Sequence, residues 1–266
     1  MICGIDFSGA SDAGSKIWLA RGVIEGKLLR IEDCRRAENL PGSGRKRDNC
    51  LRALVEFIGK EKGGLFGLDF PFGLPKPLVK ERNWSQFVAA FPVHYDSPEE
   101  FRKACWSAAA GKELKRSTDI ENQTPFSPYN LRLYRQTYFG ISKVLNPFVR
   151  DGSARILPMQ KPSRGKPVIL EVCPASSLKR KNLYLQYKGK SELHKRTRQL
   201  LLQQMERTNS LKKVKSSIRK RIVEDQGGDA LDSVIAALAT FHAVPDAVPR
   251  ATENRELYMI EGHVYT

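Results

Sequence analysis

The chain has 266 residues, of which 41% are hydrophobic and 28% are charged. This length and apolar content suffice for one large domain with a buried core, and they exclude a chain that is disordered throughout. The formal net charge of +16 favours a polyanionic partner, such as nucleic acid, a phosphorylated metabolite or an anionic membrane surface. A solvated basic surface without a partner is the alternative.

The cysteines are odd in number and widely spaced, without a C-x-x-C pair (Cys3, Cys34, Cys50, Cys105 and Cys173). This pattern is typical of reduced thiols in a cytoplasmic protein. Residues 1–6 enter a strand pattern directly and lack the layout of a signal peptide. The longest apolar stretch, residues 230–244, is too short to cross a bilayer and contains Asp232. We therefore expect a cytoplasmic protein without a membrane segment.

The first part of the chain predicts a three-stranded antiparallel meander followed by a helix. Residues 2–7 form a short apolar run that ends at a turn-rich segment. Residues 16–23 and 28–34 are two further strand patterns, and the tetrapeptide between them indicates a hairpin. Apolar residues then recur at helical spacing over 51–58.

Two later apolar runs resemble central strands that end at a proline. Residues 65–70 carry Asp69, and residues 168–174 carry Glu171. The segment between them, at about 73–151, is rich in aromatic residues and prolines and predicts a mostly helical insertion over the site. Its aromatic side chains either form a small core of their own or stack on unpaired bases.

The last third of the chain is basic and then apolar. Residues 179–221 predict mainly helical structure and contain fifteen Lys or Arg against two Glu. Such a stretch can contact nucleic-acid phosphates with salt-dependent affinity, or it can be a solvated helix face. Residues 229–238 predict a buried helix with Asp229 and Asp232 in its first turn. Residues 259–265 predict a small terminal hairpin.

This order of elements is that of a single RNase-H-like α/β domain over residues 1–266, with a mixed sheet flanked by helices. Asp6 and Asp69 end strands that can be neighbours, so their side chains can meet at one edge of the sheet. Asp229 and Asp232 share a helix face and can close the cluster from the side. Carboxylates brought together repel one another unless they are protonated or bridged by cations, and their oxygens favour Mg²⁺ or Mn²⁺.

Each carboxylate also has a structural interpretation. Asp6 and Asp69 can begin turns, while Asp229 and Asp232 can cap a helix or interact with its dipole. Glu171 can be a strand residue that pairs with a basic neighbour. The joint occurrence of the four aspartates at the ends of these elements favours a shared metal site.

Several short motifs resemble the domain-of-unknown-function 429 family, whose members are predicted RNase-H-like nucleases. The motifs are GIDFSG at 4–9, GLDFPFGLP at 67–75, YRQT at 134–137, EVCPA at 171–175, GDALDS at 228–233 and EG at 261–262. The resemblance spans almost the whole chain, and the order of the motifs is more specific than any one of them. It implies the RNase-H-like fold and an acidic site.

The helix pair is also similar to the D-x-x-D motif of Holliday-junction resolvases, which share this fold. By that similarity Asp6 and Asp69 take the two strand positions, and Asp229 and Asp232 take the helix positions. Glu171 has no counterpart there, so it is a candidate for an extra ligand or for a residue that orients a basic group.

These features predict a Mg²⁺- or Mn²⁺-dependent nuclease, in which Asp6 bridges two ions and the other three aspartates complete the ligand set. One alternative is a nucleotide-dependent phosphotransferase of the actin-like or sugar-kinase type, because Asp6, Ser8 and Gly9 followed by Lys16 resemble its first phosphate loop. Another is a non-catalytic nucleic-acid-binding module. The sequence does not indicate an oligomeric state.

Overall fold

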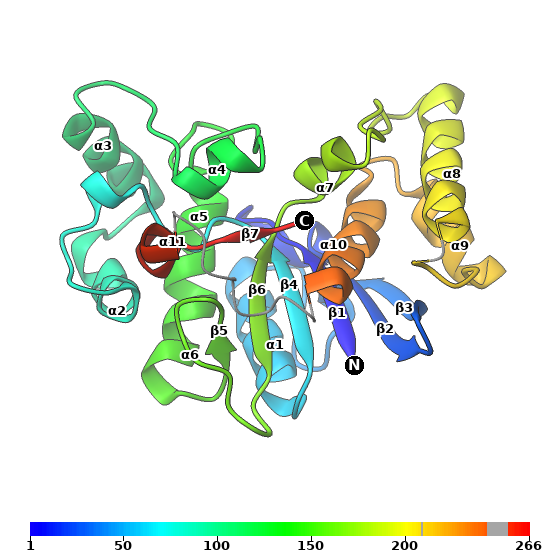
Figure 1. Ribbon diagram of the computed structural model, residues 1–266, viewed down its shortest axis with the longest axis horizontal. Helices are drawn as coiled ribbons and strands as arrows, with labels where there is room; N and C mark the ends of the chain where they lie inside the picture. Colours follow the sequence, from blue (N-terminus) through cyan, green and yellow to red (C-terminus); the bar gives the residue numbers. More distant parts are fainter. Residues whose placement is uncertain (209, 244–254) are drawn as a thin grey trace.

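The computed structural model describes residues 1–208, 210–243 and 255–266, which fold around one mixed β-sheet (Figure 1). The strand order is β3-β2-β1-β4-β6-β5, and β7 pairs with the end of β6. Only the β1–β2 and β2–β3 pairs are antiparallel among the described strands. The strands are β1 (Ile2–Asp6), β2 (Trp18–Glu25), β3 (Leu28–Arg36), β4 (Leu65–Asp69), β5 (Arg155–Ile156), β6 (Val168–Val172) and β7 (Val264–Tyr265).

Helices cover both faces of this sheet, which confirms the predicted α/β class with a mixed sheet. Within the described ranges, none of them is long and apolar enough to span a membrane. They are α1 (Arg47–Lys60), α2 (Trp84–His94), α3 (Pro98–Ala108), α4 (Ser117–Glu121), α5 (Tyr134–Gly140), the π-helical turn η4 (Ile141–Leu145), α6 (Asn146–Asp151), α7 (Pro174–Arg180), α8 (Glu192–Arg207), α9 (Ser216–Glu224), α10 (Asp229–Ala243) and α11 (Arg255–Glu261).

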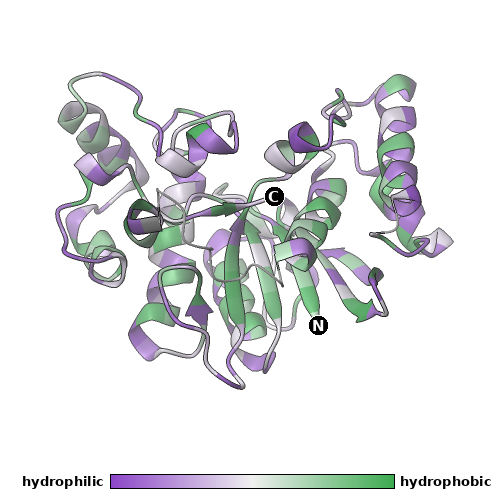
Figure 2. Cartoon of the chain, in the orientation of Figure 1, coloured by the Kyte–Doolittle hydropathy of each residue, from purple (hydrophilic) through white to green (hydrophobic). Residues whose placement is uncertain are grey.

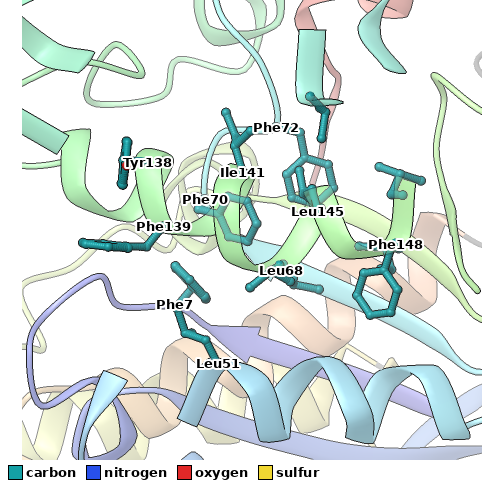
Figure 3. Packing of buried hydrophobic residues seen from close by; sticks show 14 of the residues in the cluster. Phe7, Leu51, Leu68, Phe70, Phe72, Tyr138, Phe139, Ile141, Leu145 and Phe148 are labelled. Carbon is teal, nitrogen blue, oxygen red and sulfur yellow. The ribbon is translucent and has the colours of Figure 1, made fainter. Parts of the chain in front are cut away.

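The alternation of side chains along β1 divides the core in two. Cys3 and Ile5 belong to the cluster that contains α1 and the helices of segment 73–151, and Figure 3 shows part of this packing. Ile2 belongs to the cluster on the other face, where α8, α9 and α10 pack. Asp6 follows Ile2 by four positions and therefore points to the α10 face. Figure 2 shows that hydrophobic residues predominate in the central strands between these layers.

Two glycines allow α10 to approach the sheet closely. A Cβ atom at Gly4 of β1 would lie 2.0 Å from the backbone nitrogen of Ala237 and 2.2 Å from the carbonyl oxygen of Ser233. A Cβ atom at Gly67 of β4 would lie 1.9 Å from Thr240 Oγ1. The absence of side chains at these two positions thus sets the distance between α10 and the strands that carry Asp6 and Asp69.

Gly4→Ala should destabilise the protein, because backbone atoms of α10 have to move to admit the methyl group. The expected loss is about 1–3 kcal/mol of unfolding free energy, measured by urea denaturation. Gly59→Ala is the matched control. Gly59 lies in helix α1, and a Cβ atom there would meet only Phe148 Cε1, at 3.8 Å. That variant should instead gain about 0.5–1 kcal/mol. Equal changes in unfolding free energy for the two substitutions would contradict the close contact between α10 and β1.

Segment 73–151 is mostly helical, as predicted, and its aromatic side chains chiefly form a core. Trp84, Phe87, Phe91, Phe101 and Tyr138 are buried and continuous with the cluster on the α1 face of the sheet. The rings of Phe91, Phe101 and Tyr138 pack in tilted pairs with centroids 5.2–6.3 Å apart. Their hydrophobic contacts leave these rings unavailable to bases, so the core interpretation holds for them.

Two parts of the predicted element order differ in the structure. The predicted terminal hairpin at 259–265 is wrong, because α11 runs to Glu261 and only Val264–Tyr265 is extended. That short strand, β7, pairs in parallel with β6 through long-range contacts, which a local turn signal cannot reveal. The second difference is β5, a two-residue strand beside β6 that is too short to produce a periodic pattern.

Candidate metal centre

Asp6 and Asp69 lie side by side at the carboxyl ends of parallel strands. They are directly opposite each other in the β1–β4 register, as expected for neighbouring strands that end at the same edge of the sheet. Asp69 follows Gly67 by two positions and so points, like Asp6, to the face covered by α10. Strand pairing therefore brings these two predicted site residues together.

The start of α10 brings the second pair of aspartates to the same edge. Gly228 adopts a left-handed conformation (φ 79°), which turns the chain into the helix. Asp225 accepts a hydrogen bond from the backbone amide of Ala230 (3.0 Å) and so performs the capping role. Asp229 and Asp232 are then left to project from the first turn toward β1.

Three carboxylates form a compact group, which we call the carboxylate cluster: Asp6, Asp229 and Asp232. One oxygen from each lies within 4.8 Å of the other two. Oxygens on opposite sides of a Mg²⁺ ion are about 4.2 Å apart, twice a bond of about 2.1 Å, so a small closure would complete coordination. The three hard oxygen donors fit Mg²⁺ or Mn²⁺. Asp69 lies beside the cluster and is not one of its three members.

Burial and mutual repulsion disfavour the ionised forms of these acids. Burial, followed by the charges of Asp232 and Asp229, raises the pKa of Asp6 well above its ordinary range. Burial and the charge of Asp232 raise the pKa of Asp69 to about 8. The pKa of Asp229 is also raised, mainly by burial. A divalent cation would relieve this repulsion, so the electrostatics of the cluster suit a cation site.

Two residues that sequence reasoning missed contact the cluster directly. Lys188 Nζ lies 2.6 Å from Asp232 Oδ2 and 3.6 Å from Asp229 Oδ1, and the Tyr187 hydroxyl donates to Asp232 Oδ1. Burial alone would lower the pKa of Lys188, but the carboxylates of Asp232 and Asp6 raise it above its usual range. Lys188 is therefore a positively charged counter-ion of the cluster. Its position among many lysines in a basic stretch gave no local signal of this contact.

The loop that carries Tyr187 and Lys188 is held by Arg198 of α8. This side chain is buried, and its guanidinium donates to the carbonyl oxygens of Tyr187 (2.7 Å), Gly189 (3.0 Å) and Val223 (2.8 Å). These hydrogen bonds tie the backbone of the loop to α8 and α9. One member of the basic stretch thus orients the loop above the carboxylate cluster.

Glu171 is a predicted site residue whose carboxylate is not part of the carboxylate cluster. It is opposite Leu68 in the β4–β6 register, and both point to the α1 face, away from Asp6 and Asp69. Its carboxylate accepts from Arg116 Nη1 (2.8 Å) and Nη2 (2.5 Å) and from the amide of Phe72 (2.9 Å). Of the two roles predicted for Glu171, pairing with a basic group is the one seen.

Arg116 is the centre of a second buried group, which we call the Arg116 network: Arg116, Asp119, Glu171 and Glu261. Arg116 donates to Asp119 Oδ1 (2.8 Å) and to the carbonyl oxygen of Glu261 (3.0 Å). Glu261 in turn accepts from the amides of Lys76 (2.7 Å) and Ser117 (2.8 Å). The EVCPA and EG motifs therefore meet in the fold, where they attach segment 73–151 and the chain end to the sheet.

The YRQT motif at 134–137 is also explained by packing. Gln136 Nε2 donates to the carbonyl oxygen of Phe7 (2.5 Å), just beyond β1. A Cβ atom at Gly9 would lie 2.5 Å from the carbonyl oxygen of Arg135. This motif therefore supports the turn that follows Asp6, and it supplies none of the cluster's ligands.

A cavity of about 890 Å³ opens above the carboxylates. Its lining residues include Asp6, Asp69 and Asp232. Three members of the Arg116 network, Arg116, Asp119 and Glu171, line the same cavity. One wall comes from segment 73–151 and the other from the loop of residues 184–188. A ligand in this cavity can therefore reach the predicted metal centre.

The basic stretch 179–221 is mainly helical, and part of its charge is used inside the fold. Lys195 pairs with Glu224 (2.7 Å) and Arg221 with Asp33 (3.4 Å), while Arg219 pairs with Glu206 and Lys212 with Glu25. The other exposed cations of the stretch, besides Lys188, are Arg180, Lys181, Lys190, Arg196, Arg207, Lys213, Lys215 and Lys220. They leave a basic surface smaller than the sequence count implies.

We find no family model, no curated protein and no solved structure that matches this chain. Inference about function therefore rests on the positions and chemistry of the side chains.

Asp69→Asn should become more stable relative to the wild type as the pH rises in the absence of metal. The carboxyl group of Asp69 has a raised pKa of about 8, against about 3.9 in an unfolded chain. Its contribution to stability is present below about pH 4 and is lost as the pH rises through about 8, and the amide does not titrate. Urea denaturation in EDTA between pH 4 and 9 measures the difference. Asp48→Asn, at a side chain that is 84% exposed, is the control, and a pH-independent difference for Asp69→Asn would contradict the assignment.

Proposed function

We propose that the protein is a metal-dependent nuclease with an RNase-H-like fold. The observation that carries this proposal is the convergence of Asp6, Asp229 and Asp232, with Asp69 beside them, from two parallel strands and a helix start. Carboxylate oxygens of this kind are the usual ligands of Mg²⁺ or Mn²⁺ in enzymes that hydrolyse phosphodiester bonds.

The sheet topology supports the fold assignment. A meander of β1, β2 and β3 comes first, followed by α1, and β4 and β6 then extend the sheet in parallel with β1. This is the element order expected of an RNase-H-like domain, and α10 takes the place of the later helix. The acidic residues lie where such a domain presents its carboxyl strand ends.

In the proposed reaction, a bound metal ion and the side chains of the site have different roles. A bound divalent ion would activate water and stabilise charge on the phosphate. Asp6, Asp229 and Asp232 would hold the ion, and Asp69 is close enough in register to join them. Lys188, which a metal ion would replace as counter-ion of Asp232, is then available to pair with a phosphate oxygen above the cluster.

The proposed partner is nucleic acid, bound through phosphates to exposed cations of residues 179–221. Because the structure uses several of these charges in ion pairs, charge reversal at Lys213, Lys215 and Lys220 is the informative change. The slope of log K against log salt concentration should become shallower in that variant. An unchanged slope would place the phosphate contacts elsewhere.

The test of the proposed function is cleavage of labelled nucleic acids. Single-stranded, duplex, branched and RNA–DNA hybrid substrates are incubated with Mn²⁺, Mg²⁺ or EDTA, in parallel with and without ATP. We expect shortened or nicked strands only with the metal ions. ATP consumption without cleavage would overturn the proposal in favour of a phosphotransferase, and binding without either activity would favour a non-catalytic module.

The phosphotransferase alternative gains no specific support from the site. Lys16, the basic residue of that resemblance, lines a second pocket with Arg36 and Asp229 and is not among the residues that line the cavity above Asp6 and Asp69. The described residues also contain one sheet, whereas actin-like and sugar-kinase enzymes use two such halves.

A further inference from the structure

The cavity above the carboxylates has aromatic walls on two sides. Phe126, from the loop after α4, and Tyr184, from the loop after α7, both line it. Phe126 is half-buried, and Tyr184 is 55% exposed. They differ from the buried rings of segment 73–151, because each presents part of its surface to the cavity that contains Asp6 and Asp69.

Each of these rings has a cation beside it. Arg132 lies with its guanidinium carbon 5.5 Å from the centre of the Phe126 ring, and Lys179 Nζ lies 5.3 Å from the centre of the Tyr184 ring. Arg132 and Lys188 also line the cavity. An aromatic face next to a positive charge matches a nucleotide, whose base stacks while its phosphate pairs with the cation.

The size of the cavity suits one small ligand beside the carboxylates. At about 890 Å³ it falls within the roughly 300–1,000 Å³ range of pockets that enclose one small ligand. A single nucleotide that has left the stack fits within such a space. The acids lie at the lining of this cavity, so the phosphate to be cut has to be adjacent to that nucleotide.

We propose that the cavity receives an unpaired nucleotide, with its base against Tyr184 and Phe126 and its phosphate at the carboxylate cluster. This inference rests on the proposed nuclease function and narrows it to single-stranded, branched or otherwise unpaired nucleic acid. Arg132 and Lys188 contribute positive charge from the lining of the cavity, and Lys179, which does not line it, contacts the ring of Tyr184.

The experiment measures binding in Ca²⁺, a hard cation that carboxylate oxygens also hold, and in EDTA, and gels of the recovered strands verify that they are intact. The probes are short single-stranded DNA and RNA carrying the fluorescent base 2-aminopurine, and the same strands annealed into blunt duplexes. The wild type should bind at least one single strand tighter than its duplex, with quenching of the base by stacking. Tyr184→Ala and Phe126→Ala should each weaken that binding about ten-fold or more, while Tyr184→Phe should bind within about two-fold of the wild type.

Trp106→Ala is the matched control, because Trp106 is an exposed aromatic residue (39%) that is not among the lining residues of the cavity. Its affinity should not change. Thermal melts of all variants verify that they fold. Tyr184→Phe keeps the aromatic ring and removes only the hydroxyl group. Equal affinity for strand and duplex, or an unaltered affinity of Tyr184→Ala, would overturn the nucleotide pocket.

The outcome also separates this inference from the proposed function. Cleavage that is unaffected by Tyr184→Ala would support the nuclease proposal and contradict the proposed nucleotide pocket. Binding of single strands that depends on Tyr184, in a protein that cuts no substrate, would support the pocket while the nuclease proposal fails.

Discussion

Asp6→Asn should abolish metal-dependent cleavage while the fold is retained. The amide keeps nearly the same shape but removes one anionic oxygen from a cluster whose three ligand atoms lie within 4.8 Å of one another. Loss of a residue that merely orients a ligand costs about 10–100-fold in activity or metal affinity, so removal of the ligand itself should exceed about 100-fold. Initial cleavage rates and Mn²⁺ titration calorimetry measure the two effects.

The same substitution should stabilise the metal-free protein at neutral pH. Burial and the neighbouring charges of Asp232 and Asp229 raise the pKa of Asp6, so its contribution to stability is lost as the pH rises from below its unfolded value of about 3.9. Asn does not incur this loss, and the melting temperature in EDTA should rise near pH 7 but not near pH 4. Asp48→Asn should change neither cleavage nor melting. Undiminished cleavage by Asp6→Asn would place catalysis at another site or in a contaminant.

Arg116→Met should destabilise the protein more than Gly4→Ala does. Burial alone would lower the pKa of Arg116, but the carboxylates of Asp119 and Glu171 raise it, so the side chain is positively charged. Its removal leaves two acids, each with a side chain no more than 3% exposed, without their cation. We expect a loss of about 3–5 kcal/mol in unfolding free energy, measured by urea denaturation at pH 7.

A surface pair provides the control for this prediction. Arg135 contacts Glu99 at 2.8 Å, but both side chains are more than half exposed, so Arg135→Met should lose no more than about 1 kcal/mol. Adding Glu171→Gln to Arg116→Met should recover part of the larger loss, because one buried charge is then removed. Losses of equal size at Arg116 and Arg135 would show that the Arg116 network does not stabilise the fold.

Local sequence patterns were sufficient for most elements of the sheet and for one edge of the site. Short apolar runs that end at a turn or a proline placed strands at β1, β4 and β6, and the spacing of apolar residues placed α1 and α10. Since parallel strands end at the same edge, Asp6 and Asp69 could be expected to meet, and they are register partners. Helical periodicity likewise put Asp229 and Asp232 on one face.

The position of Glu171 could not be predicted in this way. Its strand resembles β4, and its acid is also followed within a few residues by proline. The acids of the two strands point to opposite faces of the sheet. Glu171 pairs with Leu68 and not with Asp69, and neighbouring positions in a strand point to opposite faces. A shift of one residue in register thus decides whether a carboxylate joins the carboxylate cluster or the Arg116 network.

Only the tertiary structure brought Lys188, Tyr187 and Arg116 to their partners. Each of these contacts joins residues that are tens of positions apart, such as Tyr187 with Asp232 and Arg116 with Glu171. Charge counts treat all lysines and arginines in a stretch alike, yet burial makes Arg198 a positioning residue and leaves Lys190 exposed to solvent. Local periodicity determined which segments of this chain form strands and helices, whereas register and packing decided which charges face one another, since electrostatic pairing depends on distance in space and not along the chain.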